Sequence, residues 1–276
     1  MFVRLCASLL LTAMVSASTP THAYPPRPRW DSDHKRLTTA EWLITPSLAL
    51  GSLGVRFLGP RPRLTWEGGV LFDEVLYLAI APQKHRPWRT IADVSHVGFA
   101  TSIAYRVIDD LLIVGASYDA WDVGWQMFGM DLQAATIIAT SLWLPQLLIG
   151  RERPILRNCG DEARASNKCD ADNPERNRSF WAGHPALAVA TAGMTCSHHA
   201  RLQIYGGGFP DHFACGATIA LATFTTAARA IAGYHWPSDV LLGVVVGNVA
   251  WLVPVAVHYG FTDHPRAGSS KERRMP

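Results

Sequence analysis

Three long stretches without a charged side chain organise the second half of the chain. They run over 132–150, 213–228 and 240–257. A helix needs about 20 mostly apolar residues to cross the hydrocarbon core of a membrane, and the neutral residues around each run bring it to about that length. The pattern predicts three membrane-spanning helices. A shorter run over 185–197 is rich in small residues, which is typical of a helix packed inside a membrane bundle.

The first half of the chain has weaker patterns. The segments 39–58 and 91–115 are each long enough to span a membrane, and the segment 69–81 resembles an amphipathic or interfacial helix. The segment 91–115 is interrupted by Arg106, Asp109 and Asp110. The alternation typical of strands is weak throughout. We therefore predict an all-α fold, a multi-span transmembrane helical bundle.

The N-terminus resembles a targeting segment. Arg4 precedes a short apolar core, and small residues stand in a cleavage-like pattern before Tyr24. Residues 1–23 are thus expected to form a signal peptide, and a short first membrane helix is the alternative. We divide the remainder into N-terminal membrane and interfacial helices (24–119), a catalytic bundle (120–258) and a polar basic tail (259–276).

Composition changes this picture little. Hydrophobic residues make up 49% of the chain and charged residues 17%, against roughly a quarter charged in an average soluble domain, so disorder is excluded. The net charge is only +3, and because no concentrated basic stripe is visible, we expect no nucleic-acid partner. The sequence has no CxxC pair and no evident ligand set for a metal. We expect chemistry without metal or cofactor.

Three polar clusters stand at the ends of the apolar runs, over 150–154, 179–185 and 229–239. The first closes one predicted helix, the second opens the next, and the third lies between the last two. If each helix crosses the membrane once, all three clusters meet at the same membrane face.

The clusters carry groups suited to binding an anion. Arg153 and Arg229 offer planar guanidinium forks that match a phosphate group. Gly183 permits close approach of the backbone, and the helix that begins there presents free N–H groups and the positive end of its dipole. Singly, each motif is common and weak; together they predict a phosphate site.

The same clusters contain two histidines with separate roles. His235 and Asp239 are four residues apart, a spacing at which the carboxylate can hold one imidazole nitrogen and leave the other as a nucleophile. His184 is then free to protonate a leaving oxygen. This combination predicts phosphoryl transfer without a metal.

At these positions the sequence resembles the type 2 phosphatidic acid phosphatase (PAP2) superfamily, which also includes vanadium haloperoxidases. The family carries K-x6-R-P, then P-S-G-H, then S-R-x5-H-x3-D. The matching stretches here are 146–154, 181–184 and 228–239. The resemblance implies that His235 is a nucleophile that becomes phosphohistidine, that His184 is the general acid, and that Asp239 orients the nucleophile. It also implies that Arg153 and Arg229 bind the phosphate oxygens.

The chain departs from the family at four motif positions. Gln146 replaces the lysine, Ala182 the phosphate-binding serine, Trp181 a proline, and Ala228 the serine of the third motif. Gln146 can still donate a neutral hydrogen bond. The resemblance implies a membrane phosphatase acting on lipid phosphates or isoprenoid-type lipid-carrier phosphates, and the four departures would attenuate its activity. The alternative is a catalytically impaired protein that binds phosphorylated lipid or acts as a scaffold. A haloperoxidase is not favoured, because the loss of phosphate-binding groups should also weaken the binding of vanadate.

Cysteines and basic residues bear on the orientation. Cys159 and Cys169 share a polar loop and are expected to form a disulfide, which places the site on the outer, periplasmic face of a bacterial-type inner membrane. A basic tail agrees, whereas the basic residues of 56–89 favour the opposite orientation. His198 and His199 are expected to be polar surface residues.

Overall fold

The computed structural model describes residues 27–80, 87–159, 173 and 175–260. The predicted signal peptide, Cys169 and most of the basic tail lie outside these residues, so the predictions made for them stay predictions. The long helices are α2 (Thr39–Leu58), α4 (Pro87–Val107), α5 (Trp121–Leu148), α6 (Gly183–Leu202), α7 (Phe209–Ile231) and α8 (Pro237–His258). The short elements are β1 (Leu64–Trp66), α3 (Asp73–Ile80), the π-helix η1 (Ile108–Ser117), β2 (Gly150–Arg151) and the 3-10 helix η2 (Pro154–Asn158).

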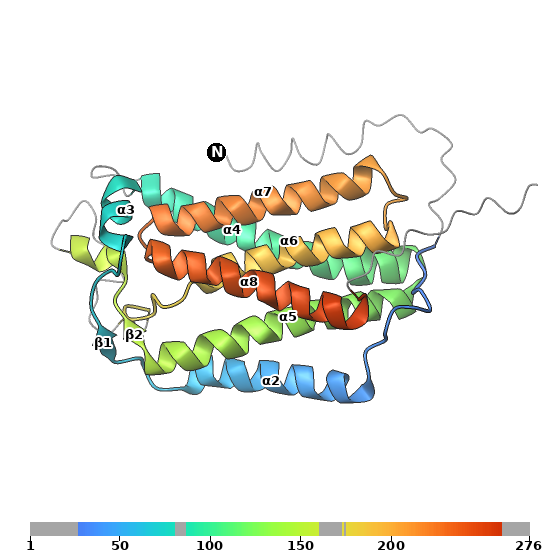
Figure 1. The fold of residues 1–276 in the computed structure, drawn as a ribbon, viewed down its shortest axis with the longest axis horizontal. Helices are drawn as coiled ribbons and strands as arrows, with labels where there is room; N and C mark the ends of the chain where they lie inside the picture. The colour runs from blue at the N-terminus through green and yellow to red at the C-terminus, as the bar shows by residue number, and fades with distance from the viewer. Residues whose placement is uncertain (1–26, 81–86, 160–172, 174, 261–276) are drawn as a thin grey trace, which may run out of the picture.

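The long helices lie side by side in one elongated bundle (Figure 1). Helix α6 contacts α4, α5, α7 and α8, while α2 packs on α5 and α4 packs on α7. Helices from both predicted parts of the chain, 24–119 and 120–258, therefore build the same bundle. The predicted all-α fold is confirmed, with β1 and β2 as a minimal parallel pair at one end.

Small residues allow α6 to be the central helix. Ala186, Ala188, Ala190 and Ala192 are all buried. The approach of α8 is so close that a side-chain carbon added at Gly247 would lie 2.4 Å from the carbonyl oxygen of Ala186. The expectation that 185–197 forms a helix inside the bundle is thus confirmed, and the absence of bulky side chains is what permits this packing.

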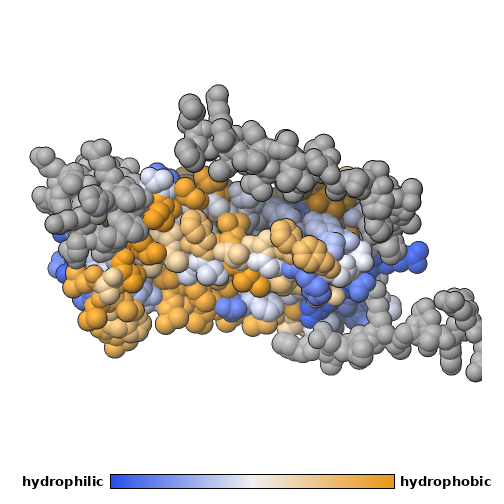
Figure 2. Space-filling model, turned by 90° about the horizontal axis from the view of Figure 1, so that it is seen from above, coloured by the Kyte–Doolittle hydropathy of each residue, from blue (hydrophilic) through white to orange (hydrophobic). Residues whose placement is uncertain are grey.

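Three of the helices, α5, α7 and α8, are long and apolar enough to cross a membrane. Their exposed sides carry large aliphatic residues; on α8 these include Leu241, Val245 and Val249, each at least half exposed. Figure 2 shows hydrophobic surface extending along the bundle, with hydrophilic residues concentrated at the end opposite β1 and β2. Such an apolar surface along the helices matches the hydrocarbon interior of a bilayer.

The short elements β1, β2, α3 and η2 gather at the end where α6 and α8 begin (Figure 1), whereas η1 continues α4 towards the opposite end. Leu64 pairs with Gly150 and Trp66 with Arg151, so the strand pair holds the chain that leaves α5 against the segment before α3. We call this the site end of the bundle. Towards the opposite, distal end, the disulfide Cys196–Cys215 joins α6 to α7, a pair that the sequence analysis did not single out.

Candidate functional site

The three polar clusters meet at the site end, as the helix count predicted. Arg153 follows α5, His184 lies in the first turn of α6, Arg229 in the last turn of α7, and His235 in the turn before α8. One guanidinium nitrogen of Arg229 lies 3.3 Å from Nδ1 of His184. The carbonyl of Tyr234, next to His235, accepts a hydrogen bond of 2.6 Å from Arg153.

His235 is buried and held by the backbone. Its Nδ1–H donates to the carbonyl oxygen of Ser179 at 2.7 Å, because a carbonyl can only accept. This bond fixes the tautomer and leaves the lone pair on Nε2, to which no described residue hydrogen-bonds. Burial, together with the positive charges of Arg153 and Arg229, holds the pKa of His235 well below its usual range. The ring is therefore neutral at physiological pH, as a nucleophile must be.

Asp239 does not hold the imidazole directly, contrary to what the spacing suggested. Its carboxylate accepts a hydrogen bond of 2.5 Å from Arg151 and one of 2.6 Å from the hydroxyl of Ser179. The buried guanidinium attracts the carboxylate, and Ser179 stands between Asp239 and His235. In this arrangement Asp239 is linked to the His235 ring through Ser179.

Arg151 is the centre of a buried ion network beneath the site. Besides Asp239, its guanidinium donates to Asp73 at 2.6 Å and lies 4.2 Å from the centre of the Trp66 ring. Asp73 in turn accepts hydrogen bonds from the backbone N–H and the hydroxyl of Ser238. Burial would raise the pKa of Asp73, but the bonds from Ser238, Val70 and Arg151 lower it overall. Arg151 thus connects β2, α3 and α8, and its charge is taken up by two carboxylates.

Arg229 is a site arginine without an ion-pair partner among the described residues. It is buried and forms no ion pair within the described residues, and its Nε is a buried donor without a partner there. Arg153 differs, because it donates to the backbone carbonyl of Glu175 at 2.6 Å and to the Glu175 carboxylate at 3.2 Å. A buried guanidinium without a counter-charge is costly, so Arg229 marks a place for an anion.

Arg229 also contacts a second histidine that sequence reasoning missed. His96 of α4 lies 3.0 Å from Nη1 of Arg229 and 3.2 Å from Nε2 of His184. Phe99, one turn further along α4, packs against the ring of His184 at 4.6 Å. No motif surrounds His96 in the sequence, so only the packing of α4 against α6 and α7 reveals it.

Gly183 and Gln146 lie where α5 meets the start of α6. A side-chain carbon at Gly183 would lie 2.5 Å from Cδ2 of Leu142, so Gly183 lies close against α5. Gln146 donates to the carbonyl of Trp181 at 3.3 Å and is buried. No contact joins it to Arg153, Arg229 or His235 within the described residues.

Trp181 and Ala182, which depart from the family motif, serve the packing. The Trp181 side chain is buried in a core cluster with Ile138 and Leu142, and its indole N–H donates to the carbonyl of Ser141 at 3.3 Å. The methyl group of Ala182 faces Gly243 of α8. The indole therefore lies in the helix core, and the backbone at 181–182 docks α6 against α5 and α8.

Comparison with known proteins gives a family match for the second half of the chain. The family model described as PAP2 superfamily matches residues 130–263. The matched range contains His184, His235 and the arginines of the site, Arg151, Arg153 and Arg229. Neither the comparison with curated proteins nor that with solved structures gives a similar protein. Among the described residues, no group of three or more His, Cys, Asp or Glu side chains is placed to hold a metal ion.

Replacing Arg151 with methionine tests the buried network. The change leaves Asp73 and Asp239 facing each other without their shared cation, and we expect a loss of about 3–5 kcal/mol in unfolding free energy, typical of a broken buried ion pair. Arg157→Met is the matched control, because Arg157 pairs with Glu74 at the surface and such a pair contributes less than about 1 kcal/mol. Thermal unfolding in detergent measures both. Equal losses would show that Arg151 carries no special charge role.

Proposed function

Because this chain belongs to the PAP2 superfamily, we propose that it is a membrane phosphatase that removes phosphate from lipid phosphates or lipid-carrier phosphates through a phosphohistidine at His235. The observation that carries the proposal is Arg229, buried and without a counter-charge within the described residues. A phosphate group between Arg229 and Arg153 would supply that charge and would stand before the free Nε2 of His235.

A proton count around Arg229 supports an anion at this place. Arg229 always donates, so His184 accepts at Nδ1 and His96 accepts at Nε2. A neutral imidazole carries its single N–H on the other nitrogen, and these other nitrogens, Nε2 of His184 and Nδ1 of His96, face each other at 3.2 Å. Two N–H groups cannot satisfy one another. A phosphate that draws the Arg229 donors away relieves this conflict and lets one ring donate to the other.

The proposed reaction has two steps. Nε2 of His235 attacks phosphorus while the bond from phosphorus to the lipid oxygen breaks, and His184 gives that oxygen its proton. Water then attacks the phosphohistidine, His184 takes the proton from the water, and inorganic phosphate and free His235 are released. The two arginines stabilise the charge on the three equatorial oxygens during both transfers. His96, which is exposed, can exchange protons between His184 and solvent.

A groove beside the site fits the apolar part of a lipid substrate. A cavity of about 690 Å³ runs between α6, α7 and α8. At the site end it is lined by Ala230 and Val240, the direct neighbours of Arg229 and Asp239, and further along by Ala227, Val244 and Trp251. Burying a methylene group contributes about 0.8 kcal/mol, so a chain lying in this groove adds affinity that a free phosphate ester lacks.

We place the site on the outer face of the cell membrane. Helix α8 starts at the site end and finishes at the distal end (Figure 1), so the basic residues after His258 follow the distal end. Basic tails favour the cytoplasmic side, which supports a periplasmic site.

A second candidate function is binding of phosphorylated lipid without turnover. It is favoured by Gln146 and Ala182, because the first donates to a backbone carbonyl and the second is buried against α8. Neither supplies the charge or the hydroxyl that the family places there. A charge-assisted hydrogen bond contributes about 1.5–3 kcal/mol, so each loss slows the reaction by about tenfold to a hundredfold if it acts on the transition state alone.

His235→Gln separates the two functions. We expect it to abolish phosphate release from lipid phosphates while leaving the folded protein and its lipid binding in place, since glutamine has no nucleophilic nitrogen. The measurement is phosphate release by purified protein, together with trapping of an acid-labile phosphoenzyme from radiolabelled substrate. His212→Gln, at an exposed position at the distal end of α7, is the control and should keep full activity. Turnover that survives in His235→Gln would eliminate the phosphohistidine mechanism.

Ala230→Trp tests the groove. The indole fills the groove next to the site, and we expect kcat/KM for a long-chain lipid phosphate to fall by about tenfold or more, the effect of losing about two buried methylene contacts. A short-chain, water-soluble phosphate ester should be hydrolysed as before, because it does not occupy the groove. Leu241→Trp, on the exposed side of α8, should change neither substrate. Equal losses on both esters would show that the groove does not hold the lipid chain.

A further inference from the structure

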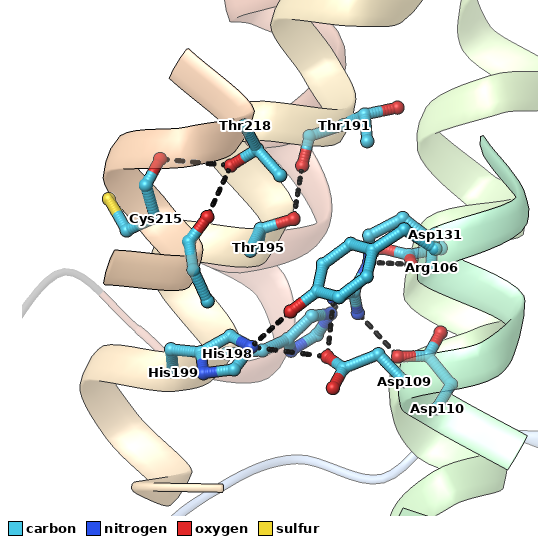
Figure 3. A network of polar contacts seen from close by, with 12 residues as sticks. Arg106, Asp109, Asp110, Asp131, Thr191, Thr195, His198, His199, Cys215 and Thr218 are labelled. Carbon is cyan, nitrogen blue, oxygen red and sulfur yellow. Dashed lines mark hydrogen bonds and ion pairs between the residues drawn. The ribbon is translucent and has the colours of Figure 1, made fainter. Parts of the chain in front are cut away.

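A second buried polar network lies at the distal end of the bundle, away from the phosphate site. It joins Arg106 and Asp109 of the α4–η1 segment to Asp131 of α5 and to His198 and His199 of α6 (Figure 3). Both histidines are at most 1% exposed. The expectation that they are polar surface residues is therefore wrong: the turn at the end of α6 directs them inward, onto carboxylates of neighbouring helices.

Arg106 is the hub of this network. Its Nη1 donates to Asp109 at 2.8 Å and its Nε to Asp131 at 2.6 Å, while Nη2 donates to Asp110. One guanidinium thus faces three carboxylates. Nδ1 of His198 lies 2.6 Å from the hydroxyl of Tyr259, and Nε2 lies 3.4 Å from Asp131. With the hydroxyl as donor to Nδ1, the ring is neutral and its single N–H faces Asp131.

Only one of the two carboxyl oxygens of Asp110 has a hydrogen-bond partner among the described residues. The residue is fully buried. Its Oδ1 accepts from Arg106, whereas its Oδ2 is buried without a hydrogen-bond partner among the described residues. Asp110 lines a cavity of about 160 Å³ whose wall is mostly apolar; its charged groups are Arg106, Asp110 and Asp131, and Thr191 also lines it. An ionised carboxylate oxygen with no donor in such a place is strongly disfavoured.

The guanidinium geometry brings Asp110 and Asp131 together. Nε and Nη2 of an arginine share one edge of the planar group, where they normally hold both oxygens of a single carboxylate. In Arg106 this edge holds Oδ2 of Asp131 and Oδ1 of Asp110, from two different side chains. Two carboxylates side by side repel each other unless a proton lies between them.

We propose that Asp110 and Asp131 bind one proton between them, with Asp110 as the protonated partner. Asp131 accepts at both oxygens, from Arg106 and from His198, so it has the role of the carboxylate. Asp110 has one oxygen free to carry O–H. The network is then a buried proton-binding site that draws its proton from solvent and is separate from the phosphate site.

The positive charge around Asp110 and Asp131 is too small to balance two ionised carboxylates. Within the described residues, the other charged and titratable groups of this network are Arg106, Asp109, His198, His199 and Tyr259. His199 lies between Asp109 and Asp211 of α7, at 3.2 Å and 2.7 Å, so whatever charge it carries serves those two carboxylates. Arg106 alone therefore has to balance Asp110 and Asp131 as well as its share of Asp109.

A bound proton makes the folded state sensitive to alkali. Above the ordinary pKa of an aspartate, about 3.9, the unfolded chain does not hold this proton and the folded chain does. Stability therefore falls as pH rises, with the contribution of this pair amounting to a tenfold change in the unfolding equilibrium per pH unit, until the folded pair itself loses the proton.

The asparagine variants of the two residues distinguish the proposal from a purely structural role. In Asp110→Asn the amide oxygen still accepts from Arg106, and the amide N–H₂ donates to Asp131 as the proposed O–H does. We expect this variant to keep the thermal midpoint of the wild type near pH 7 and to lose one proton's share of the alkaline dependence. Asp131→Asn loses one of two required acceptors and should be clearly less stable. Equal damage by both changes, or an unchanged pH dependence in Asp110→Asn, would overturn the proposal.

Infrared spectroscopy tests the wild type directly. Purified protein in lipid nanodiscs at pH 7.5 should show the carbonyl band of a protonated carboxylic acid, and the band should be missing in Asp110→Asn. Asp119→Asn is the control, because Asp119 is exposed and pairs only at the surface with Arg27; its spectrum should keep the band. A wild-type spectrum without the band refutes the shared proton whatever the variants do.

Discussion

The site depends on one buried cation, Arg151. Its guanidinium is enclosed by Asp73 and Asp239 and stacks on Trp66, and these partners come from three separate parts of the chain. Removing such a charge from water is costly unless every donor is satisfied, so the ion network forms only when the segment before α3, the end of α5 and the start of α8 meet correctly. Asp239 then fixes the hydroxyl of Ser179, and the carbonyl of the same residue fixes His235.

The cost of burying a charge also distinguishes Arg151 from Arg229 at the site end. Arg151 is neutralised by the protein, while Arg229 is buried with a donor left over. Among the described residues, two carboxylates satisfy one guanidinium and none pairs with the other, so the remaining positive charge is directed at a ligand. The distal network shows the opposite imbalance, with carboxylates in excess around Arg106. The two ends of the bundle therefore differ in what they attract: an anion at one and a proton at the other.

Sequence patterns predicted the helices and the convergence of the motifs, because apolar runs and helix count decide both. They placed the start of α5 too late: the helix begins at Trp121 and includes Asp122 and Asp131, whose charges are paired with Arg36 and Arg106. Asp73 was visible as an acid in an apolar segment, but its partner Ser238 lies far along the chain. Ser179, His96 and Glu175 act through contacts that no local spacing encodes.

An anion at Arg229 and Arg153 is expected to complete the site in front of His235. Nuclear magnetic resonance titration of the His235 ring, assigned with His235→Gln, measures this directly with and without inorganic phosphate. The positive charges of these arginines help to hold the pKa of His235 below its usual range, so a bound phosphate that offsets them should raise it. A pKa that starts low and rises on adding phosphate agrees with the account. A pKa that phosphate leaves unchanged, at concentrations that saturate binding, would contradict it.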